Sequence, residues 1–164
     1  MTAAPNNTFR TLVLHRIFAA PRALVFAACT RGEHLQQWCA PHGFTIPKSE
    51  GDVRPGGQWR SCMVAPDGTE CWLSGKYLEV EENRRVVFTH AWEEKGRRGH
   101  ETTVTLTFAD IGPKTKLTLR QQIFDSTASR DGHRDGWSQC LEKLGDLLAR
   151  LRSKSPKPAA KSRS

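Results

Sequence analysis

Apolar and polar residues alternate along two neighbouring segments in the second half of the chain, 102–109 and 115–124. One face of this pair is apolar, and the other carries hydroxyl and basic side chains. The apolar positions are Val104, Leu106, Phe108, Leu117 and Leu119, and the polar positions are Thr103, Thr105, Thr107, Lys116, Thr118 and Arg120. A period of two with one polar face predicts an antiparallel sheet that is buried on one side.

Five further segments rich in β-branched and aromatic residues predict strands separated by turn residues. They are 9–18, 44–53, 58–65, 70–80 and 85–92, which makes seven strands in all. The pair Asp67-Gly68 favours a two-residue type I′ turn between 58–65 and 70–80, because both residues of that turn take positive φ. Such a turn pairs Met63 with Trp72 and Trp59 with Lys76. Trp59, Met63 and Trp72 then share one face of the sheet.

Helical patterns precede and follow these strands. Pro21, which is tolerated at the first position of a helix, begins a segment that ends near Cys29, and a second short helix spans 33–38. One apolar stripe then marks a long C-terminal helix. Its members follow at steps of four and three, with Leu147 beside them: Trp137, Leu141, Leu144, Leu148 and Leu151. The order β-α-α-β6-α predicts an α+β helix-grip fold, in which a curved seven-stranded antiparallel sheet wraps the long helix and encloses an apolar cavity.

The net charge of +8 is concentrated at the C-terminus. Five of these charges follow Leu151 in a segment of Ser, Pro, Ala and basic residues, which leaves about +3 for the rest of the chain. This composition predicts a domain at 9–151 and a disordered basic tail at 152–164. No aromatic residue interleaves the basic ones, so we expect no nucleic-acid partner, although a basic arm touching anionic lipid or nucleic acid is the alternative interpretation.

Location and cofactors are predicted mainly from what the sequence lacks. No apolar run approaches the ~20 residues of a membrane span, and Met1–Phe9 lacks a secretory pattern, so we expect a cytoplasmic protein. The five scattered cysteines indicate reduced thiols. Cys39 and His42 have a spacing that a metal can use, but no second pair completes a site, so neither metal nor cofactor is predicted.

The sequence offers no motif for catalysis. A Gly-x-Ser-x-Gly elbow, a phosphate-binding glycine loop and a His-Glu-x-x-His helix are all absent, and no catalytic residue is assigned. His90, His133 and Arg120 are the residues on which acid–base chemistry would depend, and each has an ordinary structural interpretation.

Five tryptophans against one tyrosine suggest a cavity wall as well as a core. We take the face with Trp59 as the inner one, although the face with Tyr77 and Phe88 is nearly as apolar. Tyr77 is expected to pair with Phe88, which places His90 and Trp92 opposite Trp59 unless a bulge intervenes. Helical Gly132 and Gly136 indicate either a loose first turn or close approach to the backbone. The predicted cavity residues are Trp38, which could gate the mouth, with Trp59, Met63, Trp72, Trp137, Cys140, Leu141 and Leu144.

An ordered set of short motifs extends over almost all of the predicted domain. They are Phe18-Ala-Ala-Pro-Arg22 with Val25-Phe26, Leu35-Gln-Gln-Trp-Cys-Ala-Pro41, Asp52-Val-Arg-Pro-Gly-Gly-Gln-Trp-Arg60 with Met63 and Pro66-Asp-Gly68, Gly75-Lys-Tyr-Leu-Glu-Val80, Arg85-Val-Val-Phe-Thr89, and His133-Arg-Asp-Gly-Trp137 with Leu141 and Leu144. The chain thereby resembles the AHSA-like (activator of heat-shock protein 90 ATPase homologue) branch of the START-like, or SRPBCC, superfamily.

The resemblance implies the same helix-grip fold and a choice of functions. The superfamily includes lipid carriers, plant hormone binders and polyketide cyclases, so the expected partner is a small hydrophobic or aromatic molecule held in the cavity. The alternatives are a cyclase- or hydrolase-like enzyme using the same cavity, and a chaperone-associated interaction module. A homodimer is a further possible assembly.

Overall fold

The structure, a computed structural model, describes residues 10–154. Its elements are β1 (Thr11–Phe18), α1 (Arg22–Thr30), α2 (Gly32–Trp38), β2 (Thr45–Gly51), β3 (Gln58–Val64), β4 (Glu70–Glu81), β5 (Arg85–Glu94), β6 (Arg97–Arg98), β7 (Thr102–Ile111), β8 (Lys114–Gln122) and α3 (Thr127–Lys154). The predicted helix-grip order is confirmed, and β6 is a two-residue strand that the sequence did not indicate. Helix α3 includes the first three residues of the predicted tail, while 155–164 and Phe9 lie outside the described residues.

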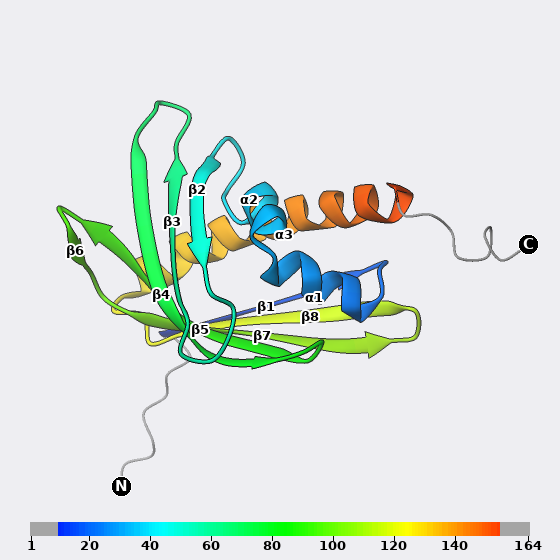
Figure 1. Ribbon diagram of the computed structural model, residues 1–164. Coiled ribbons are helices and arrows are strands. Elements are labelled where there is room, and N and C mark those ends of the chain that lie inside the picture. The colour runs from blue at the N-terminus through cyan, green and yellow to red at the C-terminus, as the bar shows by residue number, and fades with distance from the viewer. Residues whose placement is uncertain (1–9, 155–164) are drawn as a thin grey trace, which may run out of the picture.

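The strands form one antiparallel sheet in the order β1-β8-β7-β5-β4-β3-β2, with β6 paired to β5 beside this path. Figure 1 shows the sheet curving about α3, with α1 and α2 lying between β2 and the β7–β8 hairpin. Strand β5 pairs with β7 through its first half and with β6 through its last residues, so the sheet divides there. Within the described part of the chain, no helix is both long and apolar enough to cross a membrane.

The core lies between the concave face of the sheet and α3. The five apolar positions predicted for β7 and β8 are at most 3% exposed, which confirms the alternation. Opposite them, Leu141, Leu144, Leu147 and Leu148 of α3 are equally buried, which confirms the helix stripe. Helix α3 packs against β1, α1 and α2, and His133 in its first half reaches Trp92 of β5.

The predicted register between β3 and β4 is wrong by one residue. Asp67 is not among the residues with positive φ, whereas Gly68 has φ of 91°, so the turn is not of type I′. The loop instead has three residues, closed by the Ala65 N–H donating to Thr69 O at 2.9 Å. Met63 therefore pairs with Cys71, and Cys62 with Trp72. A shift of one residue moves every β4 side chain to the other face relative to β3.

The pairing of β4 with β5 is partly as predicted. Tyr77 does pair with Phe88, but the next pair is Glu79 with Val87, so Leu78 forms a bulge and is 46% exposed. Since the β3–β4 register differs from the prediction, the Tyr77 face is the one that carries Trp59. Both apolar faces that the sequence suggested thus contribute to one inner wall.

Candidate ligand-binding cavity

A cavity of about 540 Å³ lies between the inner face of β2–β5, helix α2 and the first half of α3. This volume is in the range of small-molecule sites, about 300–1,000 Å³. Its wall consists mainly of aromatic, aliphatic and sulfur-containing side chains. Among the described residues that line it, Glu50 is the one carboxylate, and it is exposed at the edge strand β2.

Five of the eight predicted cavity residues line this cavity: Trp38, Trp59, Met63, Trp137 and Cys140. Leu141 and Leu144 lie one layer deeper in the packed core and are not part of the wall. Trp72 was placed wrongly, because it follows the shifted register to the outer face. There the Arg60 guanidinium lies 3.9 Å from its ring centroid and also forms an ion pair with Glu93.

The sequence prediction missed several wall residues. Leu73, Tyr77 and Phe88 were assigned to the opposite face, and the correct three-residue turn would have found them. Three cysteines line the cavity beside the predicted Cys140, namely Cys29, Cys39 and Cys71, and their scattered positions in the sequence give no signal of this.

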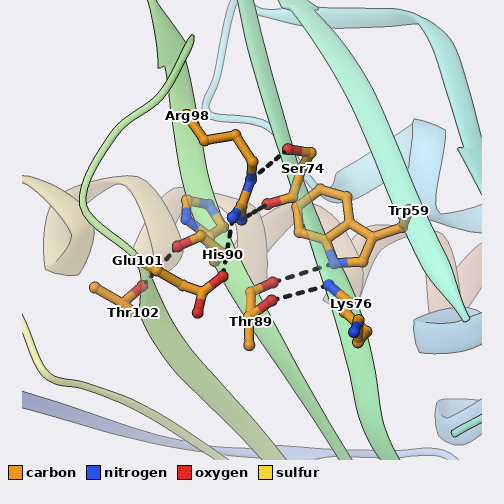
Figure 2. A network of polar contacts seen from close by, with 8 residues as sticks. All are labelled: Trp59, Ser74, Lys76, Thr89, His90, Arg98, Glu101 and Thr102. Carbon is orange, nitrogen blue, oxygen red and sulfur yellow. Dashed lines mark hydrogen bonds and ion pairs between the residues drawn. The ribbon is translucent and has the colours of Figure 1, made fainter. Parts of the chain in front are cut away.

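Trp59 is fixed by a close approach to β4. Its indole N–H donates across the sheet to Thr89 O on β5, at 3.2 Å (Figure 2). The indole nitrogen also lies close to Gly75 of β4. A Cβ atom at Gly75 would lie 1.8 Å from Thr89 O and 2.6 Å from Trp59 Nε1. The neighbouring Lys76 N–H bonds the Thr89 hydroxyl at 2.9 Å, which replaces the normal strand ladder. Glycine at position 75 is therefore required for Trp59 to lie flat on the wall.

The other side of the same strands is held by Arg98 of β6. Its guanidinium donates to both the hydroxyl and the carbonyl of Ser74, each at 2.9 Å, and forms an ion pair with Glu101 (Figure 2). The short strand β6 thus ties the 95–101 loop to β4 behind the cavity wall, where the sheet divides.

Trp137 is held by a buried chain of hydrogen bonds. Its indole N–H donates to Gln121 Oε1 at 2.7 Å, and Gln121 Nε2 donates to the Thr102 hydroxyl at 2.8 Å. Thr102 in turn donates to His90 O at 3.3 Å. Gln121 is fully buried, and it follows Leu117 and Leu119 on the same face. That polar residue in an apolar alternation was the signal that the sequence analysis overlooked.

Trp38 does not gate the cavity. It is 1% exposed, and its indole N–H donates to Ala28 O at 2.8 Å, which fastens α2 to α1. The cavity wall is therefore built from tryptophans whose polar atoms are already bonded within the protein.

Two histidines meet the indole of Trp92 at one end of the cavity. His90 is 6% exposed and lies edge-on to Trp92 and to His133, with ring centroids 5.5 Å away in both cases. Trp92 Nε1–H donates to His133 Nε2 at 3.2 Å, and His133 Nδ1 bonds Ser129 O at 2.8 Å. Burial, assisted by the neighbouring His133, lowers the pKa of His90 to about 3, so its imidazole is neutral at neutral pH. A smaller hollow of about 200 Å³ adjoins this cluster.

The cavity thiols are suited to packing and not to nucleophilic chemistry. Burial raises the pKa of Cys39 to about 12 and raises the pKa of Cys29 and Cys140 as well. All five cysteines are free thiols. Over residues 10–154 no three potential metal ligands lie together.

The family model for the Activator of Hsp90 ATPase homolog 1-like protein matches residues 19–149. The chain belongs to this family. The resemblance inferred from the motifs is thereby confirmed, and the AHSA1-like match includes every element of the cavity wall. No curated protein matches the sequence.

Solved structures of similar proteins share the fold over nearly their whole length. The AHSA1 protein from Silicibacter pomeroyi is 30% identical with a TM-score of 0.81, and the alignment covers 86% of this chain and 99% of that one. A protein from Nitrosomonas europaea is 26% identical with a TM-score of 0.78 over 90% and 99% of the two chains. One from Chromobacterium violaceum is 28% identical, also at 0.78, over 85% and 96%.

Proposed function

We propose that this protein binds a small hydrophobic or aromatic molecule in the cavity between the sheet and α3. The observation that carries the proposal is the wall itself, which combines ligand-sized volume with an apolar, aromatic surface. The indole N–H groups of Trp59 and Trp137 are bonded to the protein, so these residues present only their ring surfaces to the cavity. A wall of this kind binds by shape and apolar contact.

Obstructing the cavity at its exposed edge tests this proposal without cutting into the core. Gly132 lines the cavity at an exposed position of α3, and a Cβ atom there would have nothing within 4 Å, so Gly132→Leu adds a large side chain at this edge without a clash. Leucine is also a better helix former than glycine, so the helix is not weakened. The matched control is Ala149→Leu, at an exposed position of the same helix.

The measurement is native mass spectrometry and extraction of small molecules that co-purify with each protein, followed by tryptophan fluorescence titration with the molecules found. We expect an apolar molecule with the wild type and with Ala149→Leu, and at least a tenfold weaker affinity with Gly132→Leu. Equal binding by all three proteins would place the ligand elsewhere. A wild type that takes up no apolar probe would refute the proposal.

An enzyme using the same cavity is a second candidate, because a histidine with a shifted pKa, His90, lies on the inner face beside the protonated thiols and Tyr77. A general base works best with a pKa near the working pH, and a pKa of about 3 makes His90 a weak base at neutral pH. His90 is better suited to donating or accepting a hydrogen bond, which agrees with binding.

A chaperone-associated interaction module, to which the family description points, is the third candidate. It would use exposed apolar surface, and the large exposed apolar side chains are distributed over separate segments. They are Ile17, Leu78, Trp92, Ile111 and Ile123. The cavity therefore supports small-molecule binding more strongly than this surface supports docking.

A further inference from the structure

The hydroxyl of Tyr77 is a polar group with no partner in an apolar cavity. Tyr77 lines the cavity and is 7% exposed, and its ring lies against Phe88 with centroids 5.9 Å apart. Among the described residues its hydroxyl has no hydrogen-bond partner, and the hydroxyl oxygen is not among the fully buried atoms, so it is open to the cavity. The backbone on both sides is fixed, because Tyr77 N–H donates to Gly57 O and Gly56 N–H donates to Tyr77 O, each at 2.8 Å.

Three other hydroxyl groups of the wall are bonded within the protein. The Thr30 hydroxyl donates to Phe26 O at 2.8 Å, and the hydroxyls of Ser49 and Ser61 lie 3.3 Å apart. The Tyr77 hydroxyl, in contrast, is open to whatever occupies the cavity. A ligand that covers it without accepting its proton would leave the hydroxyl unpaired, which costs affinity, so a ligand with an acceptor atom at this place is favoured.

The surroundings of this hydroxyl favour a neutral ligand. Burial raises the pKa of Tyr77, with the thiols of Cys39 and Cys29 acting in the same direction, so the phenol stays protonated and available as a donor. The one carboxylate of the described wall, Glu50, is at the exposed edge, and a charged ligand group deep in the cavity would lose its hydration without an opposite charge.

The rings beside Tyr77 favour a flat ligand. The ring centroid of Phe88 lies 5.9 Å from those of both Tyr77 and Trp59, and the ring centroids of Trp59 and His90 are 6.0 Å apart. These four rings form a continuous aromatic wall across β3, β4 and β5. We propose that Tyr77 determines specificity, and that the ligand is a neutral, flat, apolar molecule with a carbonyl or similar oxygen that accepts a hydrogen bond from the Tyr77 hydroxyl. This inference rests on the proposed binding function and adds the chemical class of the ligand.

A pair of probes with the same shape tests this inference. 2-Acetylnaphthalene carries a carbonyl oxygen, and 2-isopropenylnaphthalene carries a CH₂ group in its place. Equilibrium dialysis of both probes is compared for the wild type, for Tyr77→Phe and for Thr30→Val. The last variant is the matched control, because it removes a wall hydroxyl that Phe26 O already satisfies.

We expect Tyr77→Phe to bind the ketone about 3- to 10-fold more weakly and the alkene equally well, since one net hydrogen bond is lost. Thr30→Val should leave both affinities unchanged. Tyr77→Phe should also keep its urea midpoint, because it removes only an unpaired hydroxyl. Equal changes for ketone and alkene, or no change for either, would overturn the role of Tyr77 while leaving cavity binding intact. Failure of both probes to bind the wild type would instead overturn the binding function and this inference together.

Discussion

The close approach of Trp59 to Gly75 leads to a strong prediction about stability. In Gly75→Ala the new Cβ atom would lie 1.8 Å from Thr89 O, a backbone atom that cannot rotate away. It would also lie 2.6 Å from Trp59 Nε1, so the indole must leave its position. The 3.2 Å hydrogen bond from Trp59 to Thr89 O is then lost, and the buried Thr89 is left with an unpaired carbonyl.

Two costs contribute to the expected magnitude. An unpaired buried acceptor destabilises by about 1–3 kcal/mol, and forcing an extra methyl group into a packed site adds about 1–3 kcal/mol. We expect Gly75→Ala to lower the free energy of unfolding by roughly 2–6 kcal/mol in urea titrations. Tryptophan fluorescence should shift as well, because Trp59 moves away from the cavity wall.

Gly132→Ala is the matched control and should change stability in the opposite direction. The same methyl group there meets nothing within 4 Å, and alanine is about 1 kcal/mol more favourable than glycine inside a helix. If Gly75→Ala lost less than about 0.5 kcal/mol, the contact with Thr89 O would not be the constraint described here. A destabilised Gly132→Ala would show that the space beside α3 is filled.

Two further predictions concern buried polar groups. Gln121→Leu should destabilise the protein by roughly 2–4 kcal/mol in urea titrations, because it removes the partners of Trp137 Nε1 and Thr102 Oγ1. The control Gln122→Leu, on the outer face, should stay within about 0.5 kcal/mol of the wild type. Equal effects of the two variants would contradict the buried chain of hydrogen bonds through Gln121. Acidification from pH 6.5 toward 3 should destabilise the wild type by up to about 1.4 kcal/mol per pH unit through His90. The unfolded chain binds a proton at this histidine in that pH range, whereas in the folded chain burial, with His133 and Arg98 nearby, opposes protonation. His90→Phe should reduce that slope and His15→Gln, on the outer face, should not; identical slopes for the wild type and His90→Phe would show that His90 does not resist protonation.

The parts of the fold that were predicted correctly depend on local periodicity. The alternation of β7 and β8 and the stripe of α3 each use positions two, three or four residues apart, and burial of one face enforces them. The strand–helix order followed in the same way. The two-residue β6 was missed because it is stabilised by Arg98 contacting Ser74, which is distant in the sequence.

The cavity was harder to predict because it depends on the length of one turn. Asp67 and Gly68 suit both a two-residue and a three-residue loop, and here the Asp67 carboxylate accepts the Thr69 N–H at 2.9 Å, which favours the longer one. Because the loop is one residue longer than predicted, Leu73 lies on the inner wall where Trp72 was expected. Trp59, Met63 and Trp137 line the cavity as expected from the sequence, because their places depend on β3 and α3 and not on the β4 register, and their role in binding stays a prediction.

The glycines of the cavity have two opposite roles, and the difference bears on function. Gly75 is required by packing, because any side chain would collide with Thr89 O. Gly132 and Gly136 are required by neither packing nor backbone conformation: neither has positive φ, and the nearest atom to a Cβ at Gly136 is Pro41 Cγ, at an ordinary 3.7 Å. Each weakens α3 by about 1 kcal/mol relative to alanine. Both line the cavity, Gly136 at a half-buried position and Gly132 at an exposed one, so the structural consequence of the two glycines is a cavity edge without side chains on α3, and a larger residue at either position would gain helix stability at the cost of that open edge.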